Sequence, residues 1–238
     1  MLELDDQPLA IVGLGDQSMI HLARSDDDEW SITDEPSLDL KGPHRGGAFR
    51  DAFNNNVILV YGTTGSAEET ARNAAQARLD SERFWYRGNG HLPFIPDTEF
   101  DSEADPDRNV IVYGNADTHA HWEALVGNSP LQIRRGGLDM GNQSVAGDDL
   151  AAVFIRPRPG SDVASIGVIA GTGPVGDRLS DQMPFFFAGV GWPDWFILEP
   201  GALTTGTDGI VATGFFDEDW SLDPAQTAVG SRVSSPNP

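Results

Sequence analysis

Two short apolar segments constrain the fold of this chain most strongly. Residues 57–61 read Val-Ile-Leu-Val-Tyr, residues 109–113 read Asn-Val-Ile-Val-Tyr, and a glycine follows each segment. Short β-branched runs that end at a glycine are typical of strands buried on both faces of a sheet. A sheet covered on both faces needs helices or further layers on each side, so these segments predict an α/β protein.

Helix-forming segments follow both strands. Residues 66–79 begin with Ser66, carry Glu68 and Glu69 in the first turn and are rich in Ala and Arg, a pattern that favours a capped helix. A second helix is expected over residues 118–126, a hairpin around 140–142, and further strands at 131–134, 151–155, 165–170, 194–198 and 209–213. The alternation of strands and helices predicts a three-layer, mostly parallel sheet of flavodoxin- or Rossmann-like topology.

The first 45 residues follow a different pattern. Residues 8–13 and 18–23 are apolar runs on either side of a Gly-Leu-Gly-Asp turn signal, which predicts two antiparallel strands. A connector rich in proline and glycine then runs to Gly47. We therefore expect a β arm with its connector at residues 1–45, an α/β domain at 46–222 and a flexible polar tail at 223–238.

The charge of the chain excludes several classes of partner. There are 37 acidic and 15 basic residues, a formal net charge of −22, which repels nucleic acid and anionic membranes. The absence of cysteine excludes disulfides, thiolate nucleophiles and cysteine-bound metals. No apolar run approaches the roughly 18 residues of a membrane span. The opening residues are acidic where an export signal would be basic, so they predict no signal peptide, and the localisation stays open.

The choice of charged residues also follows a pattern. Asp outnumbers Glu by 26 to 11, and Lys41 is the only lysine among 15 basic residues. Short hydrated carboxylates and few lysines indicate a surface adapted to high salt. A GC-rich genome, which favours Arg, Asp, Ala and Gly, is the alternative explanation.

A serine-hydrolase triad of the usual α/β type is absent from the sequence. No G-x-S-x-G elbow occurs, and the last histidine is His121, so a Ser, Asp, His order would have to be complete before mid-chain. An autonomous serine hydrolase would therefore need a nonstandard arrangement.

The most metal-like string is Asp117-Thr-His119-Ala-His121. It follows a predicted strand and looks like the D-x-H-x-H string of metal-dependent amidohydrolases. Those enzymes need further histidines on later strands, and none follows here. We expect Asp117 or Thr118 to cap a helix instead, and we keep Asp117, His119 and His121 as weak metal candidates.

The segment from Gly62 to Ser66 joins a predicted strand to a helix N-terminus. Such a loop can offer backbone N–H groups and a helix dipole to a phosphate, and it is similar to the phosphate loop of flavodoxins. Glu68 and Glu69 oppose a dianion at this position. We therefore expect a capped turn without a ligand. The alternative is a bound flavin mononucleotide (FMN), whose phosphate would contact Gly62, Thr63, Thr64, Gly65 and Ser66.

Several short motifs resemble, in order, the C-terminal region of large bacterial α/β-hydrolase proteins of the prolyl-oligopeptidase and esterase type. The resemblance covers roughly residues 18–220 and is carried by Lys41-Gly-Pro, the segment from Gly47 to Phe53, the strand ending at Tyr61, Tyr113-Gly-Asn, Pro193-Asp-Trp and Gly214-Phe-Phe-Asp-x-x-Trp220. In those proteins the region follows the domain that carries the nucleophile. That domain has no counterpart in these residues, so no catalytic residue carries over.

The resemblance implies an accessory, noncatalytic domain that packs against, gates or orients a hydrolase domain, or dimerises it. A hydrolase domain or a second copy is then the expected partner. The alternative is an autonomous esterase- or peptidase-type hydrolase with an unrecognised site. Open α/β sheets place ligands at the carboxyl edge, so the next candidates for a site are Arg87, Asn115, Asp117 and residues 171–173.

Overall fold

The structure is a computed structural model that describes residues 2–11, 19–25 and 27–233. Contacts divide the chain into two units, residues 1–40 and 41–238, and each is described by itself. The first unit contains two hairpins, made of β1 (Leu2–Leu4) with β2 (Gln7–Leu9) and β3 (His21–Arg24) with β4 (Trp30–Thr33). The side chain of Gln7 links them, because it accepts from the Trp30 N–H at 2.6 Å and donates to the Trp30 carbonyl at 2.8 Å.

This pairing differs from the predicted one. Residues 8–13 and 18–23 were expected to pair with each other, but β2 pairs with β1 and β3 pairs with β4; residues 12–18 lie outside the described residues. The turn between β1 and β2 explains the first pairing. Its two residues, Asp5 and Asp6, have φ angles of 49° and 64°, as in the tight turns that match the twist of a hairpin.

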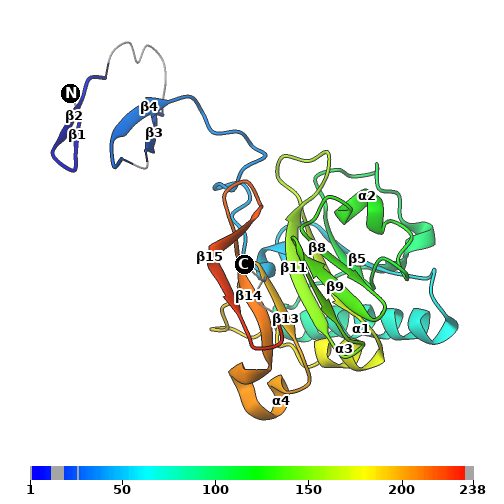
Figure 1. Cartoon of the computed structure of the whole chain (residues 1–238). Coiled ribbons are helices and arrows are strands. Elements are labelled where there is room, and N and C mark those ends of the chain that lie inside the picture. The colour runs from blue at the N-terminus through cyan, green and yellow to red at the C-terminus, as the bar shows by residue number, and fades with distance from the viewer. Residues whose placement is uncertain (1, 12–18, 26, 234–238) are drawn as a thin grey trace. The chain divides into compact units, whose positions relative to one another are not determined.

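The second unit is organised by one eight-stranded sheet (Figure 1). Its strands, in spatial order, are β15 (Leu222–Val229), β14 (Ile210–Phe216), β13 (Trp195–Leu198), β11 (Ala151–Pro157), β12 (Ser165–Gly171), β7 (Asn109–Tyr113), β5 (Val57–Tyr61) and β6 (Phe94–Pro96). The central strands are the most apolar, and every residue of β12, β7 and β13 is buried. The α/β class is therefore confirmed.

The sheet is mixed, and the expectation of a mostly parallel sheet is wrong for half of it. Strands β12, β7, β5 and β6 run parallel, whereas β11, β13, β14 and β15 join by antiparallel pairings. The physical reason is connection length. Only residues 158–164 join β11 to β12, and a parallel pair needs a crossover of a dozen or more residues.

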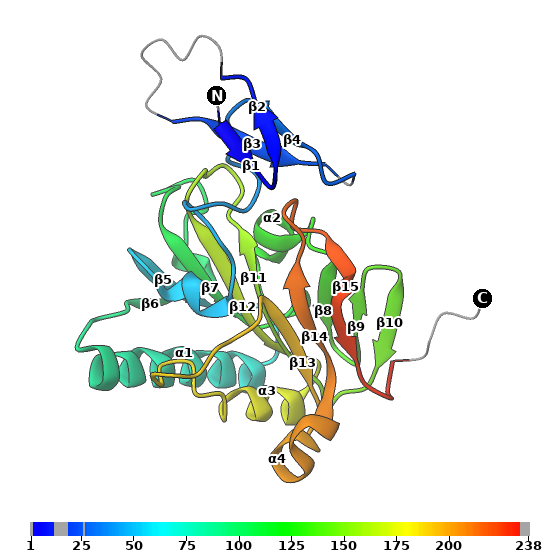
Figure 2. The same ribbon diagram turned by 90° about the vertical axis from the view of Figure 1, so that its left-hand side faces the viewer.

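The longest helix is α1 (Ala67–Gly88), which packs against β5, β6 and β7. Ser66 and Glu69 close its start with a capping box, and Asn89 ends it in the left-handed conformation. The short α3 (Pro174–Ser180) packs against β11 and β12. It lies beside α1 in both views, and Arg72 of α1 binds Asp181 after α3 at 2.9 Å (Figures 1 and 2).

Smaller elements complete the second unit. The predicted helix at 118–126 is restricted to α2 (Trp122–Val126), which leads into a second sheet of β8 (Leu131–Arg134), β9 (Gly137–Met140) and β10 (Gln143–Ala146). β9 and β10 form the predicted hairpin. The remaining helix is α4 (Ala202–Thr205), and single 3₁₀ turns lie at η1 (Phe49–Phe53), η2 (Asp97–Glu99) and η3 (Gly206–Gly209).

The C-terminal residues differ from the expected tail. Residues 223–229 form most of β15, which pairs with β14 from Phe216↔Leu222 to Ala212↔Val229. Pro224 fits in this strand because β15 is at the edge of the sheet, where a missing N–H breaks no ladder. Within the described residues, no helix is long and apolar enough to cross a membrane.

Candidate functional site

The candidate residues lie in loops that follow three parallel strands. Tyr61, Pro96 and Tyr113 are in register at the ends of β5, β6 and β7, so the loops that begin at Gly62, Asp97 and Gly114 are neighbours. Gly62 is fixed by close approach, because a Cβ there would lie 2.1 Å from the Thr118 carbonyl oxygen. This carboxyl edge is where α/β sheets usually bind ligands.

A buried carboxylate, Asp97, joins the three loops. Its side chain is fully inaccessible and accepts hydrogen bonds from the Thr63 N–H at 3.1 Å, the Thr63 hydroxyl at 2.5 Å and the Ala120 N–H at 2.7 Å. Burial raises its pKa, but these hydrogen bonds outweigh burial and hold the pKa below the usual aspartate value. Asp97 is therefore charged at neutral pH and cross-links the loops after β5 and β7.

The two histidines of the D-x-H-x-H string lie beside this hydrogen-bond network. Nε2 of His121 lies 3.0 Å from the Asp97 carbonyl oxygen, and the His121 N–H donates to Nδ1 of His119 at 3.2 Å. His119 is 2 % exposed, and burial lowers its pKa to about 4 despite the nearby Asp97 carboxylate. A neutral, buried imidazole with this pKa makes a poor general base.

Asp117 does not join the histidines. Its carboxylate accepts from the Arg135 N–H at 2.8 Å, and its own N–H donates to the Asn115 side chain at 3.0 Å. No group of three or more potential metal ligands occurs among the residues that the structure describes. Asp117 is therefore held by the turn and by the Arg135 amide, apart from the two histidines.

The loop from Gly62 to Ser66 already has acceptors for most of its amides. The Gly62 N–H donates to the Tyr113 carbonyl at 2.9 Å, the Thr63 N–H to Asp97 and the Thr64 N–H to the Thr118 carbonyl at 3.1 Å. The Ser66 N–H donates to the Glu69 carboxylate at 2.7 Å. A phosphate would have to displace these acceptors, so the hydrogen bonds favour a capped turn over an FMN phosphate site.

Glu69 also forms a bidentate ion pair with Arg135 at this edge. Its two carboxylate oxygens accept from Arg135 Nε at 2.7 Å and from Nη2 at 2.8 Å. The Arg135 hydrogen bonds lower the pKa of Glu69 to about 2, against a smaller opposing effect of burial. The negative charge of Glu69 at the start of α1 is therefore paired with Arg135.

The remaining candidates separate into two places. The Asn115 side-chain amide donates to the Gly171 carbonyl at 2.8 Å and ties the end of β7 to the end of β12. The Leu150 N–H donates to the Thr172 hydroxyl at 3.1 Å and ties the residue after β12 to the residue before β11. Arg87 lies near the far end of α1, against the Phe187 ring. It is not part of the carboxyl edge.

Sequence reasoning missed the central residue of this network. Asp97 follows a three-residue strand, Phe94-Ile-Pro96, that is too short and too rich in proline to be recognised from the sequence. The available signal was the position of an aspartate directly after the apolar segment Phe94-Ile-Pro96, which lies in the sequence between the two buried strands.

A second buried cluster contains four of the six segments that carry the resemblance. Lys41 forms an ion pair with Asp194 and donates to the Phe216 carbonyl, and its ammonium group lies 5.2 Å from the centre of the Trp220 ring. Asp194 also accepts from the Ala48 N–H at 2.6 Å and the Phe216 N–H at 2.9 Å. These four segments, far apart in sequence, therefore meet at one ion pair.

No protein-family model matches this chain, and no curated protein matches it.

Proposed function

We propose that the second unit is a noncatalytic α/β domain that acts as an accessory to a serine hydrolase of the esterase or peptidase type. The observation that carries this proposal is the hydrogen-bonding of Asp97 at the carboxyl edge. This buried carboxylate binds three donors from the two neighbouring loops, so the polar groups there are used to hold the loops together.

The groups available for nucleophilic catalysis are engaged elsewhere. The Thr63 hydroxyl donates to Asp97, and the Ser66 hydroxyl accepts from the Glu69 N–H at 3.2 Å. The hydrogen bonds of His119 and His121 go to backbone groups and to each other, not to a hydroxyl. Among the described residues of this edge, no histidine contacts a hydroxyl, and the carboxylate that does, Asp97, is already bound by two backbone amides.

The cluster around Lys41 and Asp194 supports the link to a hydrolase system. The motifs that resemble the C-terminal region of prolyl-oligopeptidase and esterase-type proteins hold the domain together, as expected of a region whose shared residues are structural. The spatial order β6, β5, β7, β12 is also that of the first strands in a flavodoxin-like sheet, which supports the predicted topology for this half.

The proposal is tested by complex formation. A hydrolase domain with a G-x-S-x-G elbow, encoded in the same reading frame or operon, is purified separately and mixed with the full chain. We expect a stable complex in analytical ultracentrifugation and altered turnover of p-nitrophenyl butyrate. Independent sedimentation of the two proteins with unchanged turnover would contradict the proposal, as would the absence of any such coding sequence.

A further inference from the structure

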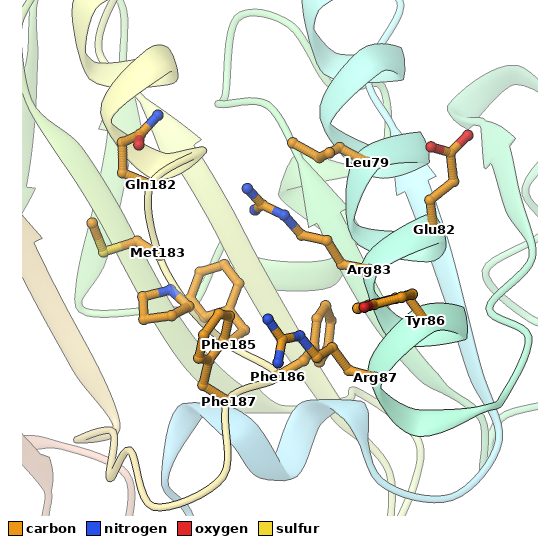
Figure 3. Close-up of a pocket in the computed structure, with 11 residues that line it drawn as sticks. Leu79, Glu82, Arg83, Tyr86, Arg87, Gln182, Met183, Phe185, Phe186 and Phe187 are labelled. Carbon is orange, nitrogen blue, oxygen red and sulfur yellow. The ribbon is translucent and has the colours of Figure 1, made fainter.

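A cavity of about 430 Å³ lies between the C-terminal half of α1 and residues 182–187 (Figure 3). It is far from the Asp97 edge, because α1 rises about 1.5 Å per residue and Leu79 lies twelve residues beyond Ala67. The α1 side supplies Leu79, Glu82, Arg83, Tyr86 and Arg87, and the other side supplies Gln182, Met183, Pro184, Phe185, Phe186 and Phe187.

The apolar part of this cavity is built on a buried aromatic base. Phe185 is 1 % exposed and its ring lies 5.0 Å from that of Phe49, while the Phe186 ring lies 5.4 Å from that of Phe84. Phe187 and Tyr86 stay open to solvent, at 45 % and 76 % exposure. The cavity therefore combines a fixed aromatic floor with exposed rings that a ligand can cover.

Two arginines extend from α1 across the cavity toward residues 182–187 (Figure 3). The Arg87 guanidinium lies 4.0 Å from the centre of the Phe187 ring and makes no ion pair with any described residue. Arg83 contacts Asp80 only at 3.6 Å. The acidic side chain of the lining, Glu82, points away from residues 182–187 and binds Arg78 at 2.8 Å.

Two carboxyl groups, Asp80 and Asp181, interact with Arg83. Burial raises the pKa of Asp80 to about 7, even though the Tyr113 hydroxyl and Arg83 oppose this shift. Burial also raises the pKa of Asp181, against the charges of Arg72 and Arg83. In a chain with a net charge of −22, this cavity thus places two arginines beside exposed aromatic rings.

We propose that this cavity binds a small monocarboxylate with an aromatic body. The planar guanidinium groups of Arg83 and Arg87 match a carboxylate, which can accept two parallel N–H bonds, while the body of the ligand packs on Phe186 and Phe187. The volume falls within the range of pockets that hold small ligands. This site goes beyond the accessory function and does not depend on it.

The test compares three ligands with one aromatic body and different head groups. 2-Naphthylacetate, 2-(2-naphthyl)ethanol and 2-(2-naphthyl)ethylamine are titrated into the full chain by isothermal calorimetry at pH 7. We expect the acid to bind at least tenfold more tightly than the alcohol, and the amine not to bind. Equal affinities for acid and alcohol, or no heat from the acid at millimolar concentration, would overturn the proposal.

Two variants separate the cavity from general charge effects. Arg87→Gln should weaken binding of the acid about tenfold and leave binding of the alcohol unchanged, because a charge-assisted hydrogen bond is lost. Arg178→Gln, at an exposed position on α3 outside the cavity, changes the net charge equally and should have no effect. Phe187→Leu should weaken the binding of both the acid and the alcohol. An equal loss in the Arg87 and Arg178 variants would overturn the proposal.

Discussion

Lys41 and Asp194 are 153 residues apart in the sequence and form a largely buried ion pair that fastens the segment before η1 to the start of β13. The Asp194 side chain is 1 % exposed, so its charge depends on Lys41 and on the two amides that bind it. Lys41 is the only lysine of the chain. Its use here is structural.

Replacing Lys41 should therefore be costly. Lys41→Met leaves the buried Asp194 carboxylate without its cation, and we expect a loss of about 3 kcal/mol in the free energy of unfolding. The matched control is Arg78→Met, which removes a cation from the exposed pair with Glu82 and should cost less than about 0.5 kcal/mol. Urea unfolding at pH 7 measures both. A Lys41 variant as stable as the control would show that the pair of Lys41 with Asp194 contributes nothing to the free energy of unfolding.

Asp97→Asn tests the carboxylate that joins the sheet-edge loops. The amide keeps one acceptor oxygen but loses the charge that three donors bind, so we expect a loss of about 2 kcal/mol. The pKa of Asp97 is depressed, so its stabilisation is present above the usual aspartate pKa and is lost as the pH falls through the lower folded value. The difference from wild type should therefore shrink in acid. Asp101→Asn, at an exposed turn, is the control, and an equal effect there would refute the role of Asp97.

Asp80 should give the opposite pH dependence. Its folded pKa of about 7 lies above the unfolded value of 3.8, so the folded state holds the proton more tightly between these values. Stability from this group is full below about pH 4 and declines as the pH rises toward 7. Asp80→Asn keeps an acceptor for the Tyr113 hydroxyl at 3.1 Å and should flatten this decline. Thermal unfolding of both proteins from pH 4 to 8 provides the comparison, and parallel curves would contradict the assignment.

The excess of Asp and Glu predicts a response to salt. Self-repulsion at a net charge of −22 is screened at high ionic strength, so the melting temperature should rise between 0.1 M and 2 M KCl. Sucrose at matched water activity serves as the control for solute effects. An unchanged melting temperature in KCl would rule out salt adaptation.

The buried strands could be predicted from the sequence because burial on both faces leaves a continuous apolar run. β5, β7 and β8 have the bounds expected from their residues, and β11 and β12 begin where expected and are slightly longer. Helix α1 extends nine residues beyond the predicted end, because the segment from Asp80 to Gly88 still carries helix-forming residues such as Glu82 and Arg83.

Strand direction was harder to predict, because a run of apolar residues does not encode its orientation. The signal that was overlooked is the short segment between β11 and β12, residues 158–164, which contains Pro159 and Gly160 and is too short for a helical crossover. The start of the 118–126 helix was misjudged for a local reason. The Asn115 and Thr118 side chains bind nearby backbone amides and hold residues 115–121 in turns.

The candidate site was only partly predictable. The sequence correctly indicated that the loops after β5 and β7 lie together, because parallel strands end at one edge. The sequence could not reveal that Asp97 cross-links the loops at that edge, or that Arg87 and Phe187 meet at a separate cavity. Both depend on contacts between distant segments.

The central claim is that the described part of this domain holds no histidine-activated nucleophile, and covalent labelling tests it most directly. The purified chain is incubated with an excess of an alkyl fluorophosphonate, beside a known serine esterase, and both are analysed by intact-mass spectrometry and by p-nitrophenyl butyrate turnover. The account predicts an unchanged mass and turnover equal to that of the heat-denatured chain. One phosphonyl adduct per folded chain, together with turnover that the reagent abolishes, would contradict it.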